Sequence, residues 1–214
     1  SKETTDRKDA LIKINDLAKE IEKRKQELGG ADKLRKDLDK LKDIAKGPAD
    51  KMAEALKEGD FGKAQEEMKK LTEDLKTGKL AKEDQEKLAK QLEQVKEKLQ
   101  QAMQDKKEAQ QQLQQQIEQK LAEGKVGEAA KLQQQLDQLN QGADQQQALM
   151  QQLADKLGQA SEALKNGGDP KQAAEQLDKL AGELSQMQQQ LEQLDNLQEV
   201  LDQLADAKDA MNCE

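Results

Sequence analysis

The chain has 214 residues, in which 36 lysines and arginines face 44 aspartates and glutamates, and it contains no histidine, tryptophan or tyrosine. Only 34% of the residues are hydrophobic and 37% are charged, a balance that is typical of long helices and coiled coils and too polar for a large compact core. The absence of histidine excludes Ser-His-Asp and Cys-His nucleophile systems and histidine-based zinc sites.

The first two predicted helices cover residues 5–28 and 31–46. Gly29-Gly30 separates them, because each glycine costs roughly 1 kcal/mol inside a helix and is well tolerated just after one. Apolar residues recur at helical spacing in the first helix, at Leu11, Ile14, Leu17 and Ile21. Shorter helices follow over residues 49–58 and 60–77, and Asp60 is expected to cap the second of these.

A long helix is predicted over residues 80–123. Its apolar residues follow steps of four and three and so form one narrow seam: Leu88, Leu92, Val95, Leu99 and Ala102. A disordered chain, the alternative at this composition, has no reason to keep such spacing, and strand alternation is absent. We therefore expect an all-α fold.

The last helices are predicted over residues 125–140, 143–166 and 170–211. Asp169 is expected to cap the last of them, and Pro170 suits its first position, where the missing N–H is harmless. The seams predict a core that includes Leu92, Val95, Leu99, Leu177, Leu180, Leu184, Leu191 and Leu201, with Met103, Met150 and Met187 filling gaps.

The two halves of the chain align with each other, helix breakers included. Leu38-Asp39-Lys40-Leu41 matches Leu136-Asp137-Gln138-Leu139, and Ala102-Met103 matches Ala210-Met211, which gives a repeat of about 108 residues. We expect an elongated antiparallel coiled-coil or three-helix-bundle architecture, with a first repeat over 1–100 and a second over 101–214 that share the long helix 80–123. A coiled coil that aligns with itself without duplication is the alternative.

This plan of three helical stretches per unit, with a long helix shared between units, is similar to that of the spectrin repeat. In composition the chain resembles uncharacterised glutamine-rich coiled-coil proteins of bacteria. It has 35 glutamines, and all but one of them lie between residues 65 and 203. The resemblance implies tandem helical bundles.

Charge is distributed unevenly, because residues 1–99 hold 26 basic and 24 acidic side chains while residues 100–214 hold 10 and 20. The densest basic cluster, Lys23-Arg24-Lys25, is neutralised by the nearby Glu20, Glu22 and Glu27. It offers no continuous surface for a phosphate backbone, so no nucleic-acid partner is expected.

No catalytic residue, cofactor site or metal site is expected, and no small-molecule ligand is predicted. Gly78-Lys79 lacks the upstream glycine of a phosphate-binding loop, and carboxylate pairs such as Glu66-Glu67 suit solvated helix faces. The single cysteine, Cys213, has no partner for an intrachain disulfide. Two interpretations stay open for this end of the chain: Cys213 is an exposed thiol without a role, or the chain, which begins at Ser1 and stops as its last helix ends, is an excised piece of a longer protein. No signal peptide or membrane-spanning run is visible in the sequence.

The apolar strip near the end of the last helix is the candidate interaction surface. It comprises Leu197, Val200, Leu201 and Leu204. A two-helix seam needs only two apolar positions per heptad, and this segment has more, so it can pack against two neighbouring helices. The alternative is that a third helix of the second bundle covers it. We expect a non-enzymatic structural or protein-interaction module, a spacer or partner-binding segment that contacts a protein partner or a second copy. The alternative function is that of a peripheral protein binding membrane surfaces through amphipathic helices.

Overall fold

In the computed structural model, which describes residues 2–140 and 142–212, the chain folds into helices joined by short turns, apart from the longer irregular connection 39–49. The helices are α1 (Lys2–Leu38), α2 (Asp50–Glu58), α3 (Phe61–Lys76), α4 (Lys82–Ala122), α5 (Val126–Asn140), α6 (Ala143–Leu164), the short 3-10 helix η1 (Lys165–Gly167) and α7 (Pro170–Asn212). No strand occurs in these ranges, and the all-α prediction is confirmed. Cys213 lies outside the described residues.

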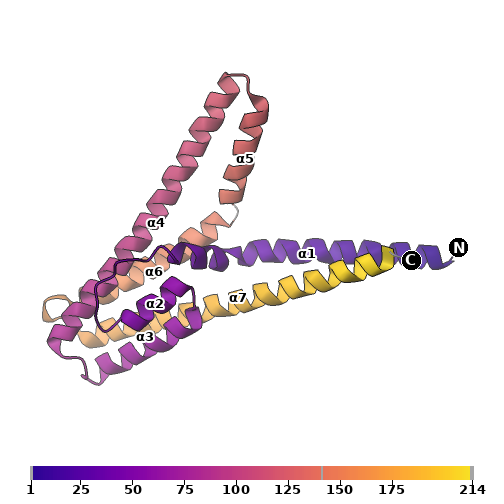
Figure 1. Ribbon diagram of the computed structural model, residues 1–214. Coiled ribbons are helices and arrows are strands. Elements are labelled where there is room, and N and C mark those ends of the chain that lie inside the picture. The colour runs from indigo at the N-terminus through magenta and orange to yellow at the C-terminus, as the bar shows by residue number, and fades with distance from the viewer. Residues whose placement is uncertain (1, 141, 213–214) are drawn as a thin grey trace.

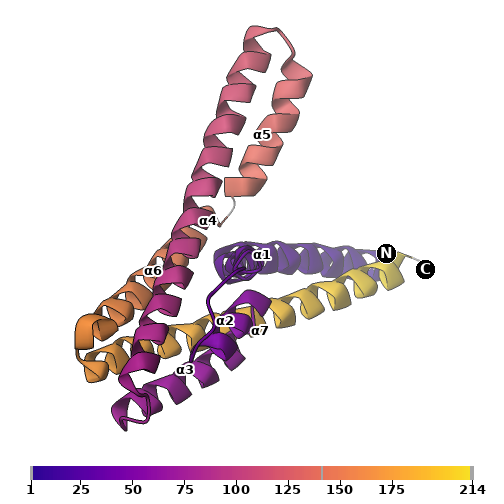
Figure 2. The ribbon, with the colours of Figure 1, turned by 60° about the vertical axis from the view of Figure 1, so that its left-hand side comes forward.

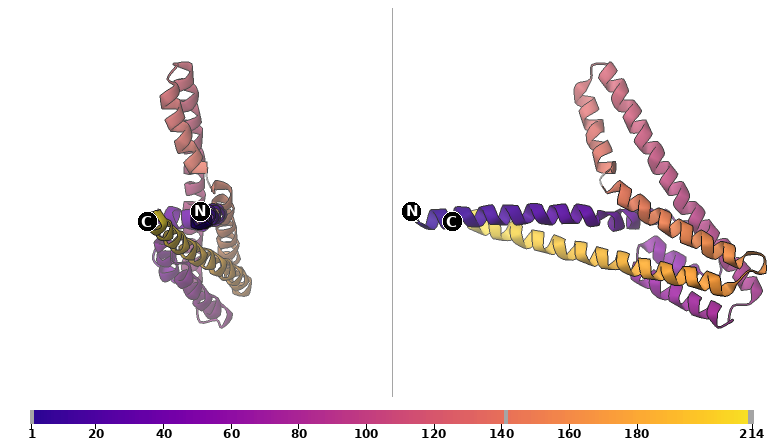
Figure 3. Two further views of the ribbon diagram at one scale, coloured as in Figure 1. Left: turned by 90° about the vertical axis from the view of Figure 1, so that its right-hand side faces the viewer. Right: turned by 180° about the vertical axis from the view of Figure 1, so that it is seen from behind.

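Two arms extend from a central bundle (Figure 1). Residues 2–28 of α1 and residues 195–212 of α7 form the terminal arm, in which α1 extends past the end of α7 (Figure 3). The α4–α5 hairpin, residues 104–140, projects in another direction (Figure 2). With 43 residues, α7 spans about 64 Å, so the molecule is elongated.

The central bundle has one continuous core. It contains residues from the end of α1, from α2, α3 and α6, and from the first halves of α4 and α7, so both predicted repeats contribute to it. Its largest fully buried side chains include Phe61, Met68, Leu92, Met150 and Leu157. The predicted core residues are buried as expected, including Met150 and Met187, apart from Leu201 and Met103, which are only half-buried.

The predicted break at Gly29-Gly30 is wrong, because α1 continues through both glycines to Leu38. On either side of the glycines the helix buries large apolar side chains: Leu28 is 5% exposed and Leu34 is 0% exposed. Burying one leucine contributes roughly 1.5–3 kcal/mol, which offsets the cost of about 1 kcal/mol for each glycine in a helix. Tertiary packing thus overrides the local helix-breaking signal.

The predicted helix over 31–46 is also too long, since α1 ends at Leu38 and residues 41–46 have no regular structure. Two glutamines of α4 bind this segment instead. Gln94 Oε1 accepts from the backbone N–H of Ala45 at 2.8 Å, and Gln91 Nε2 donates to the carbonyl oxygen of Ala45 at 2.8 Å. These side chains satisfy backbone groups that a helix would otherwise pair with one another.

The predicted caps are confirmed. Asp60 Oδ1 accepts from the backbone N–H of Lys63 at 2.8 Å, at the start of α3. Asp169 Oδ1 accepts from the N–H of Lys171 at 2.9 Å, and α7 begins at Pro170. These bonds satisfy amides that have no partner within the helix.

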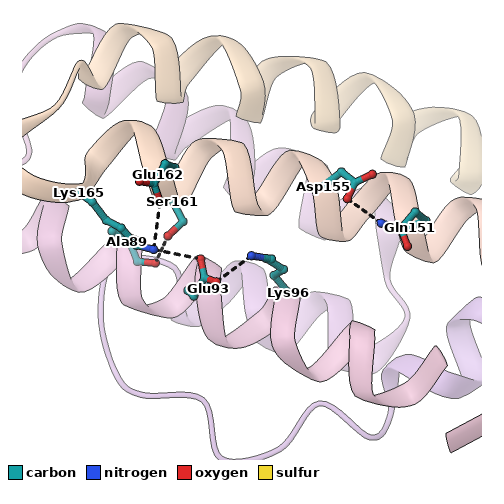
Figure 4. A network of polar contacts seen from close by, with 8 residues as sticks. All are labelled: Ala89, Glu93, Lys96, Gln151, Asp155, Ser161, Glu162 and Lys165. Carbon is teal, nitrogen blue, oxygen red and sulfur yellow. Dashed lines mark hydrogen bonds and ion pairs between the residues drawn. The ribbon is translucent and has the colours of Figure 1, made fainter. Parts of the chain in front are cut away.

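Polar contacts also join α4 to α6 (Figure 4). The buried hydroxyl of Ser161 donates to the carbonyl oxygen of Ala89 at 2.8 Å. Beside it, Glu93 pairs with Lys96 at 2.9 Å on its own helix and with Lys165 of η1, which directly follows α6, at 3.4 Å. The hydrogen bond to Lys96 and the charge of Lys165 lower the pKa of Glu93 despite its partial burial.

Candidate interaction surface

The terminal arm is an antiparallel pair of helices with a uniform register. Lys25 Nζ of α1 donates to Gln198 Oε1 of α7 at 2.5 Å, and Lys208 Nζ of α7 donates to Asn15 Oδ1 of α1 at 3.1 Å. From the first contact to the second, the residue number falls by ten on α1, from 25 to 15, and rises by ten on α7, from 198 to 208. The two helices therefore pair without a slip between these contacts.

The apolar seam of this arm is less enclosed than the core. Ile21 is 7% exposed and Leu28 is 5% exposed, but nearer the tip Leu11 and Ile14 are only half-buried. The seam is open because just two helices form it, and two helices cannot surround an apolar side chain as a bundle does.

The structure places the four predicted surface residues on α7 within this arm. Leu197, Leu201 and Leu204 are half-buried, whereas Val200 is 39% exposed. The alternative that a third helix covers this strip is wrong for the part of the chain that the structure describes, where α1 is the one helix that lies along it (Figures 1 and 3). The cause is the straight course of α1, which carries its first half beyond the bundle.

Sequence reasoning missed one member of this surface. Leu17 was expected in the seam of α1, but it is 44% exposed, and Ala18 is the half-buried residue. Leu17 precedes the seam residue Ala18 by one position, just as Val200 precedes Leu201. In an antiparallel pair equivalent positions fall on the same side, so Leu17 and Val200 share one side of the arm. The side chains Leu17, Leu197, Val200, Leu201 and Leu204 are called the arm strip below.

The carboxylates at this end of α7 lie on the side of the helix away from Val200. Between residues 195 and 212 this helix carries one lysine, Lys208, and five carboxylates, which are Asp195, Glu199, Asp202, Asp206 and Asp209. The facing half of α1 is mixed in sign. At 100° per residue, these five carboxylates fall about 100–180° around α7 from Val200, so between residues 195 and 212 α7 gives no acidic border to the side of the arm that carries Leu17 and Val200.

Over residues 2–140 and 142–212, no three histidine, cysteine, aspartate or glutamate side chains come together as metal ligands require. Within the same ranges, none of the helices combines the length and the apolar character that crossing a bilayer demands.

No protein-family model, no curated protein and no solved structure matches the chain.

Proposed function

We propose that this protein is a non-enzymatic structural and protein-interaction module, an elongated spacer that binds another protein through the arm strip. The observation that carries the proposal is the exposure of Leu17 and Val200 on one side of a two-helix arm, at 44% and 39%. A third helix laid against that side would bury both residues together with the half-open seam beneath them, as in a three-helix bundle.

The uncharged surface beside the arm strip indicates the chemistry of the partner. On the Val200 side of α7 the neighbouring positions are Asn196, Gln203 and Ala207, so the complementary partner is an amphipathic helix whose apolar stripe packs on the strip. Membrane-surface binding has less support, since anionic lipids attract basic segments and this end of α7 carries five carboxylates and one lysine.

A synthetic amphipathic peptide tests this proposal. The probe carries leucine at its seam positions and lysine at the flanks, and its binding to the protein is followed by fluorescence anisotropy. We expect binding to weaken at least about tenfold in the double variant Leu17→Gln with Val200→Gln, because both replaced side chains would be buried by the peptide. The same peptide with glutamine in place of its seam leucines should bind much more weakly.

The chain offers a matched control at the far tip of the α4–α5 hairpin. Leu121 and Val126 are 53% and 65% exposed, so Leu121→Gln with Val126→Gln removes the same two residue types from another exposed place. Equal loss in both double variants, or no binding by the unaltered protein, would refute the proposal. Analytical ultracentrifugation of the same proteins identifies a second copy as the partner if self-association is lost only in the arm variant.

A further inference from the structure

A cavity of about 340 Å³ lies where the α4–α5 hairpin meets the end of α1, and it is separate from the arm strip. Four lysines line it: Lys33 and Lys36 of α1, Lys40 just after α1, and Lys106 of α4. Ala109 of α4 and Leu139 of α5 provide an apolar part of its wall. The volume falls in the range of small-molecule sites.

Two of these lysines are half-buried, and among the described residues neither has a carboxylate within 4.0 Å. Lys33 Nζ donates to the carbonyl oxygen of Gln138 at 3.3 Å, and Lys106 Nζ donates to Oε1 of the buried Gln146. The rim lysines differ, since Lys36 pairs with Asp32 at 2.8 Å and Lys40 with Asp37 at 3.3 Å. The hydrogen-bond acceptors of Lys33 and Lys106 are uncharged amide oxygens. The positive charges of these two lysines therefore stay without a neutralising partner among the described residues of the cavity.

The pKa values of both lysines are lowered, which reflects the cost of holding two positive charges in a partly buried place. Burial lowers the pKa of Lys106; Asp37 opposes this effect, and the charges of Lys33 and Lys40 add to it. Burial lowers the pKa of Lys33 as well, and Lys36 adds to that shift. An anion placed between the two ammonium groups would stabilise their charged forms.

The two carboxylates of the cavity are bound by groups other than Lys33 and Lys106, so they do not replace such an anion. Asp37 is held by Lys40 and by the Nε2 of Gln146, while Asp105 accepts from Gln101 Nε2 at 2.7 Å. Because Lys36 pairs with Asp32 and Lys40 pairs with Asp37, the charges left in the lining are those of Lys33, Lys106 and Asp105, a sum of +1 in a protein whose net charge is -8. A phosphate monoester, which carries about -1.5 to -2 at neutral pH, supplies the charge opposite to the ammonium groups of Lys33 and Lys106.

We propose that this cavity binds a phosphate monoester with a small apolar group, with the phosphate between Lys33 and Lys106 and the apolar group against Ala109 and Leu139. Phosphate is favoured over carboxylate because ammonium groups bind phosphate as point charges, whereas paired recognition of carboxylates is the specialty of arginine, which the lining lacks.

Phenyl phosphate is the probe, titrated into the full chain by calorimetry at low salt and at a pH above the second phosphate pKa of about 6. We expect binding by the unaltered protein and a loss of roughly tenfold or more in Lys106→Gln and, independently, in Lys33→Gln, because a hydrogen bond between charged groups is removed. Lys107→Gln is the matched control: it removes the same charge one residue along α4, from a side chain outside this cavity, and should weaken binding less than about twofold.

Vesicles that contain phosphatidic acid distinguish a lipid headgroup from a soluble ester. Flotation of the protein with these vesicles, lost in Lys106→Gln and kept in Lys107→Gln, assigns the phosphate to a lipid; phenyl phosphate binding without flotation assigns it to a soluble ligand. The proposal is overturned if neither probe binds, or if Lys107→Gln loses as much affinity as Lys106→Gln. Urea unfolding of each variant shows that the binding losses arise in folded protein.

Discussion

Gln91 of α4, whose side chain is fully buried, donates a hydrogen bond from Nε2 to the carbonyl oxygen of Ala45, 46 residues earlier in the chain. The same amide group donates to Asp50 Oδ1 at 2.7 Å, and its Oε1 accepts from the backbone N–H of Ala49 at 2.8 Å. One side chain thus fastens both the irregular segment after α1 and the start of α2 to the bundle.

Replacing Gln91 should be costly for that reason. We expect Gln91→Ala to lower the free energy of unfolding by about 2–4 kcal/mol, since it leaves buried backbone groups without partners. Urea denaturation measures the change. Gln100→Ala, on an exposed side of the same helix, should stay within about 0.5 kcal/mol of the unaltered protein. Similar effects at both positions would contradict the fastening role of Gln91.

The fully buried Leu184 tests the core of α7. Leu184→Ala should lower the free energy of unfolding by about 2–5 kcal/mol, because it leaves a cavity in the enclosed part of the bundle. The contrasting substitution is Leu121→Ala at the hairpin tip, where the side chain is 53% exposed and the expected change is below about 1 kcal/mol. Thermal unfolding followed by circular dichroism compares the two, and an unchanged melting temperature for Leu184→Ala would place this residue outside the core.

The three-and-four spacing was sufficient to predict Leu92 and Leu184 in the core, because a long helix in water must cover its apolar side. It did not predict how far α1 extends, since the burial of Leu28 and Leu34 that offsets the cost of two glycines depends on helices far along the chain. Lys33 and Lys106 stand 73 positions apart, and no local pattern indicates that they share a cavity. In the arm, the widened apolar strip was sufficient to predict Val200 as a surface residue. The exposure of Leu17 could not be predicted, because it depends on how α1 pairs with α7.

Substitutions at Gly29 and Gly124 test the effect of backbone conformation on stability, because neither site would crowd an added methyl group. A Cβ atom added at Gly29, inside α1, or at Gly124, in the turn of the hairpin, would meet nothing within 4 Å, but Gly124 has a φ of +73°. We expect Gly29→Ala to raise the free energy of unfolding by about 0.5–1 kcal/mol, and Gly124→Ala to lower it by about 1–2 kcal/mol. Urea denaturation gives both values. Destabilisation by Gly29→Ala would argue against a continuous α1 in solution.

The pH dependence of stability should report the ion pairs of Glu93. Its pKa is lowered in the folded protein, so its contribution to stability is fully present above the unfolded-state value near 4.5 and is lost as the pH falls through the folded-state pKa. Glu93→Gln removes this contribution at every pH. The difference in unfolding free energy between the two proteins should therefore be largest near neutral pH and shrink in acid, and a difference that grows in acid would contradict the pairing with Lys96 and Lys165.

Small-angle scattering tests the two-armed shape. A compact protein of 214 residues has a radius of gyration of about 17 Å, and two arms built from helices about 60 Å long should raise the measured value well above that. A value near 17 Å would show that the arms fold back onto the bundle in solution.

The pairing in the terminal arm also has a consequence for the order of events during biosynthesis. Asn15 and Lys208, which meet in this arm, are 193 residues apart, whereas Lys120 and Glu128 pair across a single turn of the α4–α5 hairpin. A ribosome exposes the first half of α1 long before its partner strip on α7 exists, and an unpaired helix of that length is only marginally stable in water. The hairpin can close as soon as it emerges, while closure of the arm waits for the synthesis of α7 and bears the larger entropy of loop closure. The first half of α1 is therefore translated before every other helix described here but gains its partner after them, and until then its apolar seam is open to chaperones.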